Sequence, residues 1–137
     1  MISVLVPSRH RPELAKRLLD TINNTKKSDV EVKFYLNDND PTIETYKKLL
    51  PKSVYIIGPD QSTCYSWNYL STIAKHNYCM LVGDDAQFLS KHWDQHIVDF
   101  FETYKHKDKI LYVCPRDMTP KDKRRWEKYN LPTDKPY

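Results

Sequence analysis

Glycine is scarce in this sequence: only two of the 137 residues are glycine, Gly58 and Gly83. A P-loop or a dinucleotide-binding turn needs several glycines, because backbone amides must approach a phosphate closely. Both motifs are therefore excluded. If the chain binds a nucleotide, its phosphates must be neutralised by another device. The candidates are a metal ion held by Asp85 and cationic contacts from Arg9 and Arg11.

Cysteines are few, and long apolar runs are missing. The three cysteines, Cys64, Cys79 and Cys114, are scattered and form no CxxC pair, which predicts buried free thiols in a reducing compartment. No apolar run approaches the roughly 20 residues that span a bilayer. Residues 1–7 contain neither a basic leader nor an extended apolar stretch, so no signal peptide is expected. We predict a cytoplasmic location.

The length fits one domain, residues 1–137, which ends in a short basic helix and tail at about 115–137. The formal net charge is +4, and residues 105–128 hold nine Lys/Arg against four Asp/Glu. This basic segment predicts an anionic acceptor or a membrane surface as partner, with a solvated helix face as the alternative. Nucleic acid is a less favoured partner, because no motif that reads nucleic acid accompanies the basic residues.

Hydrophobic periodicity predicts strands that alternate with helices. The predicted strands span residues 2–6, 30–36, 54–57, 78–82 and 110–113, and the predicted helices span 12–25, 40–50, 62–76, 90–104 and 119–129. Asp40 and Ser90 are the expected N-caps of two helices. Trp67 is expected in the core, and the helix after Ser90 is expected to bury a stripe that includes Trp93 and Phe100. The alternation predicts an α/β fold, a mainly parallel sheet with helices on both faces.

Polar residues follow four of the predicted strands. They form the clusters Pro7-Ser8-Arg9, Asn37-Asp38, Asp60-Gln61 and Gly83-Asp84-Asp85. Ligands of parallel sheets bind outside the carboxyl ends of the strands, so we expect these clusters to lie together.

The cluster Gly83-Asp84-Asp85 is the most informative, because it directly follows the apolar run 78–82. Charge at the end of a buried strand is costly unless a cation or a hydrogen-bond network meets it. Carboxylates favour hard divalent ions such as Mg²⁺ and Mn²⁺. A solvated turn or a helix cap is the structural alternative, since Asp is common there.

Taken together, these residues resemble the nucleotide-binding half of a family 2 (GT-A fold) glycosyltransferase of the compact phage or bacterial type, whose sheet is Rossmann-like. The resemblance covers about residues 2–94. Residues 2–9 resemble the first strand and base-binding loop, and Gly83-Asp84-Asp85 resembles a variant DXD metal motif. The donor-nucleotide-binding residues predicted from the first loop and this resemblance are Pro7, Ser8, Arg9, Arg11, Asp38, Asn68 and Asp84. By the same resemblance Asp85 binds Mn²⁺ or Mg²⁺, and Asp84 faces the ribose or the water shell of the metal.

The resemblance implies a metal-dependent, inverting transfer of a sugar from a nucleotide-diphosphate donor, most plausibly a UDP-sugar, to an unknown acceptor. It identifies no catalytic base, because family members continue much further than the 52 residues that follow Asp85. Asp117 is a candidate base only through its place after a predicted strand. The alternative is a nucleotide-sugar-binding module that needs a partner chain or a missing C-terminal region. A sugar-phosphate nucleotidyltransferase is disfavoured, since that family uses a glycine-rich first loop.

Overall fold

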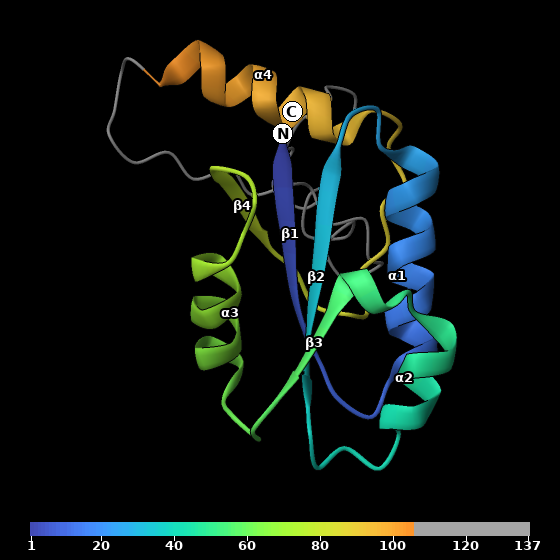
Figure 1. Ribbon diagram of the computed structural model, residues 1–137. Helices are drawn as coiled ribbons and strands as arrows, with labels where there is room; N and C mark the ends of the chain where they lie inside the picture. The colour runs from blue at the N-terminus through green and yellow to red at the C-terminus, as the bar shows by residue number, and fades with distance from the viewer. Residues whose placement is uncertain (106–137) are drawn as a thin grey trace, which may run out of the picture. The chain divides into compact units, whose positions relative to one another are not determined.

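The protein is described here from a computed structural model, in which residues 1–105 are described. Its sheet has four parallel strands in the order β3-β2-β1-β4 (Figure 1). The strands are β1 (Ile2–Ser8), β2 (Val30–Asn37), β3 (Tyr55–Gly58) and β4 (Tyr78–Leu81). The helices are α1 (Pro12–Thr25), α2 (Ile43–Leu49), α3 (Thr63–Thr72) and α4 (Trp93–Tyr104), with a short 3₁₀ helix at Lys52–Val54. Residues 1–99 form one compact unit, and Phe100 begins a second.

Helices cover both faces of the sheet, as predicted. Successive residues of β1 point to opposite faces: Val4 and Val6 belong to the larger core with α1 and α2, whereas Leu5 packs with Leu70 of α3. Figure 1 shows α1 and α2 on one side of the sheet and α3 on the other. The α/β fold class predicted from the sequence is therefore confirmed, and Trp67 packs against the Leu5 cluster as expected.

Two predicted helix starts are wrong. Helix α2 begins at Ile43, so Asp40 is not its N-cap. Asp40 instead accepts hydrogen bonds from Thr42 N at 2.8 Å and from His10 N at 2.7 Å, which ties the β2–α2 turn to the loop after β1. Helix α4 begins at Trp93, three residues beyond the expected cap Ser90.

Four further expectations are wrong: those on the length of α3 and on the burial of β4, of two cysteines and of Phe100. Helix α3 ends at Thr72 rather than at residue 76 and packs on β1 and β2. Leu81, opposite Leu5 in the register, is consequently 55% exposed, so β4 is not a buried strand. Cys64 and Cys79 are exposed rather than buried. In the predicted stripe of α4, Trp93 is buried but Phe100 is exposed.

Several predictions fall outside the described residues: the strand at 110–113, the helix at 119–129, Cys114, Asp117 and most of the basic segment 105–128. Within residues 1–105, none of the helices has the length and apolar character that a bilayer crossing requires.

Candidate functional site

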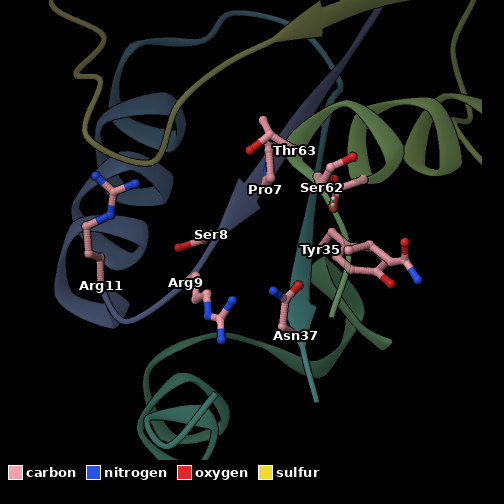
Figure 2. A pocket seen from close by; sticks show the side chains of 10 residues that line it. Pro7, Ser8, Arg9, Arg11, Tyr35, Asn37, Ser62 and Thr63 are labelled. Carbon is pink, nitrogen blue, oxygen red and sulfur yellow. Dashed lines mark hydrogen bonds between the residues drawn. The ribbon is translucent and has the colours of Figure 1, made fainter. Parts of the chain in front are cut away.

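A pocket of about 260 Å³ opens at the carboxyl ends of β1 and β2, beside the first turn of α3 (Figure 2). It is lined by Pro7, Ser8, Arg9, Arg11, Tyr35, Asn37, Gln61, Ser62, Thr63 and Ser66. Parallel sheets bind their ligands at this edge, because the connections from strand to helix gather there. Pro7, Ser8, Arg9 and Arg11 were predicted as donor-binding residues, and the structure brings these four together in one pocket.

The loop from β1 to α1 carries the two pocket arginines. It is short, since β1 ends at Ser8 and α1 begins at Pro12, which suits the first position of a helix. His10 has a φ of 58°, in the left-handed region, and its backbone N–H donates to Asp40 Oδ2 at 2.7 Å. Although burial raises the pKa of Asp40, its bonds from Thr42 and His10 lower that pKa below the ordinary value. An ionised Asp40 therefore stabilises the turn that places Arg9 and Arg11 at the pocket.

The first turn of α3 forms the opposite wall of the pocket. Ser62 is the N-cap, and its Oγ accepts a hydrogen bond from Tyr65 N at 3.2 Å. The first amides of a helix carry a partial positive charge and face outward along the axis. Figure 2 shows Ser62 and Thr63 on the far side of the pocket from Arg11. The pocket thus lies between a helix N-terminus and Arg11, which pairs with Asp84, while Arg9 pairs with Asp60.

Asp60 joins the ends of three strands at the rim of the pocket. Arg9 Nη1 donates to both of its oxygens, at 2.9 and 3.1 Å, and Asn37 Nδ2 donates to Oδ1 at 2.6 Å. A further bond comes from Asn39 Nδ2 at 3.0 Å. The hydrogen bond from Asn39, followed by the charge and hydrogen bond of Arg9, lowers the pKa of Asp60. Because one Nδ2 hydrogen of Asn37 is bonded to Asp60, the amide is oriented, and its oxygen and second Nδ2 hydrogen are the groups left for the pocket.

Asp84 is fully buried and bonded to protein groups from the same pocket. Ser8 Oγ donates to Asp84 Oδ2 at 2.6 Å, and Arg11 Nη2 lies 2.8 Å from Oδ1 as an ion pair whose angle does not meet hydrogen-bond geometry. Tyr46 of α2 bonds to Ser8 Oγ at 2.7 Å through its hydroxyl. Burial raises the pKa of Asp84 and outweighs the opposing effects of Ser8 and Arg11. Ser8 and Arg11 of this chain therefore meet the charge of this carboxylate.

Asp85 differs from its neighbour, because its side chain is exposed. Among residues 1–105 no three His, Cys, Asp or Glu side chains are grouped as an all-protein metal cage. Ions that serve a nucleotide need only one or two carboxylates, since the substrate phosphates and water complete the shell. Both oxygens of Asp84 already contact protein groups, so Asp85 is the carboxylate of the pair whose chemistry fits such an ion.

The remaining predicted residues lie away from the pocket lining. Asp38 is exposed and its backbone N–H donates to Gly58 O at 2.7 Å. Asn68 is exposed on α3. The lining residues that sequence reasoning did not assign to the site are Tyr35, Asn37, Gln61, Ser62, Thr63 and Ser66. Asn37 and Gln61 belong to clusters already noticed after strands, and a helix N-terminus beside those clusters is the signal that points to Ser62 and Thr63.

Comparison with known proteins gives one informative match. The chain is 24% identical over 133 residues to abequosyltransferase RfbV of Salmonella typhimurium (strain LT2). The chain is a distant relative of a glycosyltransferase. The match takes in 87% of the chain, which spans 37% of the length of that relative. No family model matches the sequence. The four-stranded parallel sheet is consistent with a Rossmann-like glycosyltransferase fold.

Proposed function

We propose that the protein is a metal-dependent glycosyltransferase that uses a nucleotide-diphosphate sugar, with UDP as the favoured nucleotide. The pocket carries this proposal: Arg11 and the first turn of α3 face it from opposite sides, at the sheet edge where nucleotides bind. A guanidinium and a helix N-terminus on opposite sides of a pocket suit a diphosphate even though the chain lacks a glycine-rich loop. The similarity to an abequosyltransferase supports sugar transfer as the reaction class.

Asn37 supports uridine as the nucleoside. Its amide is oriented by Asp60, so that the amide oxygen, an acceptor, and the second Nδ2 hydrogen, a donor, can meet a base in the pocket. Uracil can pair with this amide through its imide N–H and an adjacent carbonyl oxygen, whereas cytosine presents an acceptor nitrogen beside an amine and would require the amide to be flipped. A site that presents a fixed acceptor discriminates against bases that cannot pair with it, because a buried polar group is then left unbonded.

Asp85 would hold Mn²⁺ or Mg²⁺ against the diphosphate, and a bound ion supplies charge that stabilises the departing nucleotide. Arg11 contributes a fixed positive charge to the same region, and it is held there by Asp84. We further propose inversion at the anomeric carbon and a cytoplasmic location. The acceptor would be anionic or membrane-bound and would meet residues 105–128, which lie outside the described residues except for Lys105.

A nucleotide-sugar-binding module is the second candidate. It is favoured by the extent of the match, since the chain spans 37% of the length of the related transferase. Such a module would bind UDP and metal through the same pocket, but it would need a partner chain or further residues for the transfer step.

Calorimetric titration with UDP, with and without Mn²⁺, tests the proposal on the wild type, Asp85→Ala and the control Asp20→Ala. Asp20 pairs with Lys16 on α1 and has no part in the pocket. We expect Mn²⁺ to strengthen UDP binding by tenfold or more in the wild type and the control, and to have little effect in Asp85→Ala. Metal-dependent binding that survives in Asp85→Ala would overturn the assignment of the metal ligand.

Two further measurements on the same samples complete the test. CDP should bind more weakly than UDP by roughly tenfold if Asn37 reads the imide hydrogen, and Asn37→Asp should lower the affinity for both. Hydrolysis of UDP-sugars would identify an enzyme, whereas binding of UDP and metal without turnover would identify the module.

A further inference from the structure

Arg17 of α1 contacts the loop that carries Asp85, although it does not line the pocket. Its Nη2 donates to the backbone oxygen of Asp85 at 3.0 Å. With the amide oxygen of Gln87 turned toward it, Arg17 also donates from Nη1 at 3.0 Å and from Nε at 3.1 Å. A planar guanidinium directs such bonds from three separate nitrogens, whereas an ammonium group has all its donors on one nitrogen. Arg17 therefore spans the two residues on either side of Ala86.

Arg17 is one of three residues on the same side of α1 that contact the loop after Gly83. Further along the same loop, Thr21 Oγ1 accepts from Phe88 N at 3.2 Å, and Thr25 O accepts from His92 N at 2.7 Å. Arg17, Thr21 and Thr25 are four residues apart, so they share one face of the helix. If Arg17 were removed, the remaining contact nearest to Asp85 among these would be the bond from Phe88 N to Thr21 Oγ1. Phe88 is three residues after Asp85.

The carboxylate of Asp85 lies close to the backbone of a neighbouring residue. It lies against Gly83, where an added Cβ would stand 2.8 Å from Asp85 Oδ1. The conformation of residues 83–87 thus sets where this carboxylate sits. Arg17 holds that segment by its backbone at Asp85 and by the side chain of Gln87.

We propose that Arg17 is a positioning residue that orders the Asp85 loop for metal binding. The inference rests on the proposed function, because it takes Asp85 as the ligand of the nucleotide-bound ion. Arg17 holds the backbone of this ligand in place, as outer groups hold the ligands of metal sites. The chain thereby uses two arginines six residues apart: Arg11 pairs with the side chain of Asp84, and Arg17 bonds the backbone of Asp85.

The test measures UDP binding with and without Mn²⁺ for the full chain carrying Arg17→Met, Arg17→Lys or the control Lys16→Met. Lys16 is a neighbouring cation of α1 that pairs with Asp20 instead of the loop. We expect Arg17→Met to weaken UDP binding in Mn²⁺ by about tenfold and binding without metal by less than twofold. Arg17→Lys should show most of the same loss, because it keeps the charge but not the planar set of nitrogens that reaches both Asp85 and Gln87. Lys16→Met should match the wild type.

Hydrogen exchange on the ligand-free proteins provides a readout that does not depend on the metal. Arg17→Met should speed exchange of the Ala86 and Phe88 amides severalfold and leave those of β1 unchanged. Unchanged exchange in the loop would overturn the inference, as would wild-type UDP binding by Arg17→Lys in Mn²⁺, which would point to charge alone. If wild-type UDP binding shows no metal dependence, the proposed function fails, while the exchange data still decide whether Arg17 orders the loop.

Discussion

Arg11 and Asp84 form an ion pair between an exposed guanidinium and a carboxylate that has no exposed surface. The two atoms Arg11 Nη2 and Asp84 Oδ1 lie 2.8 Å apart, and the side chain of Arg11 is 51% exposed while that of Asp84 is 0% exposed. Arg11 thus lines the pocket, and the buried carboxylate of Asp84 holds its guanidinium in place. The pair links the start of α1 to the residue before Asp85, so the loops after β1 and β4 are joined by an ion pair.

The variant Tyr46→Phe tests the tyrosine hydroxyl that bonds to Ser8 Oγ and to the backbone N–H of Arg11. Ser8 gives its only hydrogen to Asp84, so Tyr46 must donate to Ser8, and Tyr46 Oη accepts from Arg11 N at 3.0 Å. Removing this hydroxyl leaves two groups without their partner, at a cost of about 1–2 kcal/mol in unfolding free energy. We also expect UDP to bind severalfold more weakly.

Urea denaturation and UDP titration measure both effects of Tyr46→Phe. Tyr69→Phe is the matched control, since Tyr69 is exposed on α3 and stacks its ring on Tyr65. The control should change unfolding free energy by less than about 0.5 kcal/mol. Equal effects in the two variants would contradict the role given to Tyr46.

Asp84→Asn is predicted to change the pH dependence of stability. Burial holds the folded-state pKa of Asp84 above 3.8, so the native state keeps its proton to higher pH than the unfolded chain. The stability that this carboxyl contributes is present below about pH 4 and is lost as the pH rises through its folded-state pKa. The unfolding free energy of Asp84→Asn should therefore rise relative to that of the wild type as the pH increases from about 3 to about 7.

Asp94→Asn is predicted to change the pH dependence of stability in the opposite direction, and the same denaturation series measures it. Asp94 is also fully buried, but Ser28 and the backbone of Lys27 and Ser28 bond its carboxylate, and these bonds lower its pKa despite burial. Its contribution is present above about pH 4 and is lost as the pH falls. Asp94→Asn should thus lose stability relative to the wild type as the pH rises. If the unfolding free energies of the two variants changed with pH in the same direction relative to the wild type, the assignment of opposite pKa shifts to Asp84 and Asp94 would be refuted.

Alanine at the two glycines should have different effects. At Gly58 an added Cβ would stand 2.5 Å from Tyr35 Oη, and Tyr35 is buried and bonded to Pro59 O. Gly58→Ala is expected to cost about 1–3 kcal/mol of unfolding free energy. At Gly83 the Cβ meets only the end of the Asp85 side chain, which can move.

Gly83→Ala should accordingly cost less than about 1 kcal/mol and should instead weaken the Mn²⁺-dependent binding of UDP. Thermal unfolding and calorimetric titration of both variants separate the two effects. A Gly83→Ala protein with full metal-dependent binding would show that the Asp85 carboxylate is not confined by this glycine.

The sequence by itself determined the order of the elements and the edge at which the site forms. Helix α1 spans Pro12–Thr25 as predicted, because its boundaries depend on residues close in the chain: a first-turn proline and an apolar face of period 3.6. The predicted strand ends lie within two residues of the observed ones, because they depend on local apolar runs. Parallel strands then bring Ser8, Asn37 and Asp84 to one edge whatever their sequence separation.

Only the tertiary structure decided which group meets the charge of Asp84. Ser8 lies 76 residues away in sequence, and Tyr46 approaches from a helix whose start was mispredicted. The edge position of β4 and the exposure of Leu81 likewise depend on where α3 packs. Local sequence patterns report periodicity and turn chemistry, whereas ion pairs and burial depend on which distant surfaces come together. For this reason the sequence could not distinguish Asp84, which is buried and paired with protein groups, from the exposed Asp85 beside it.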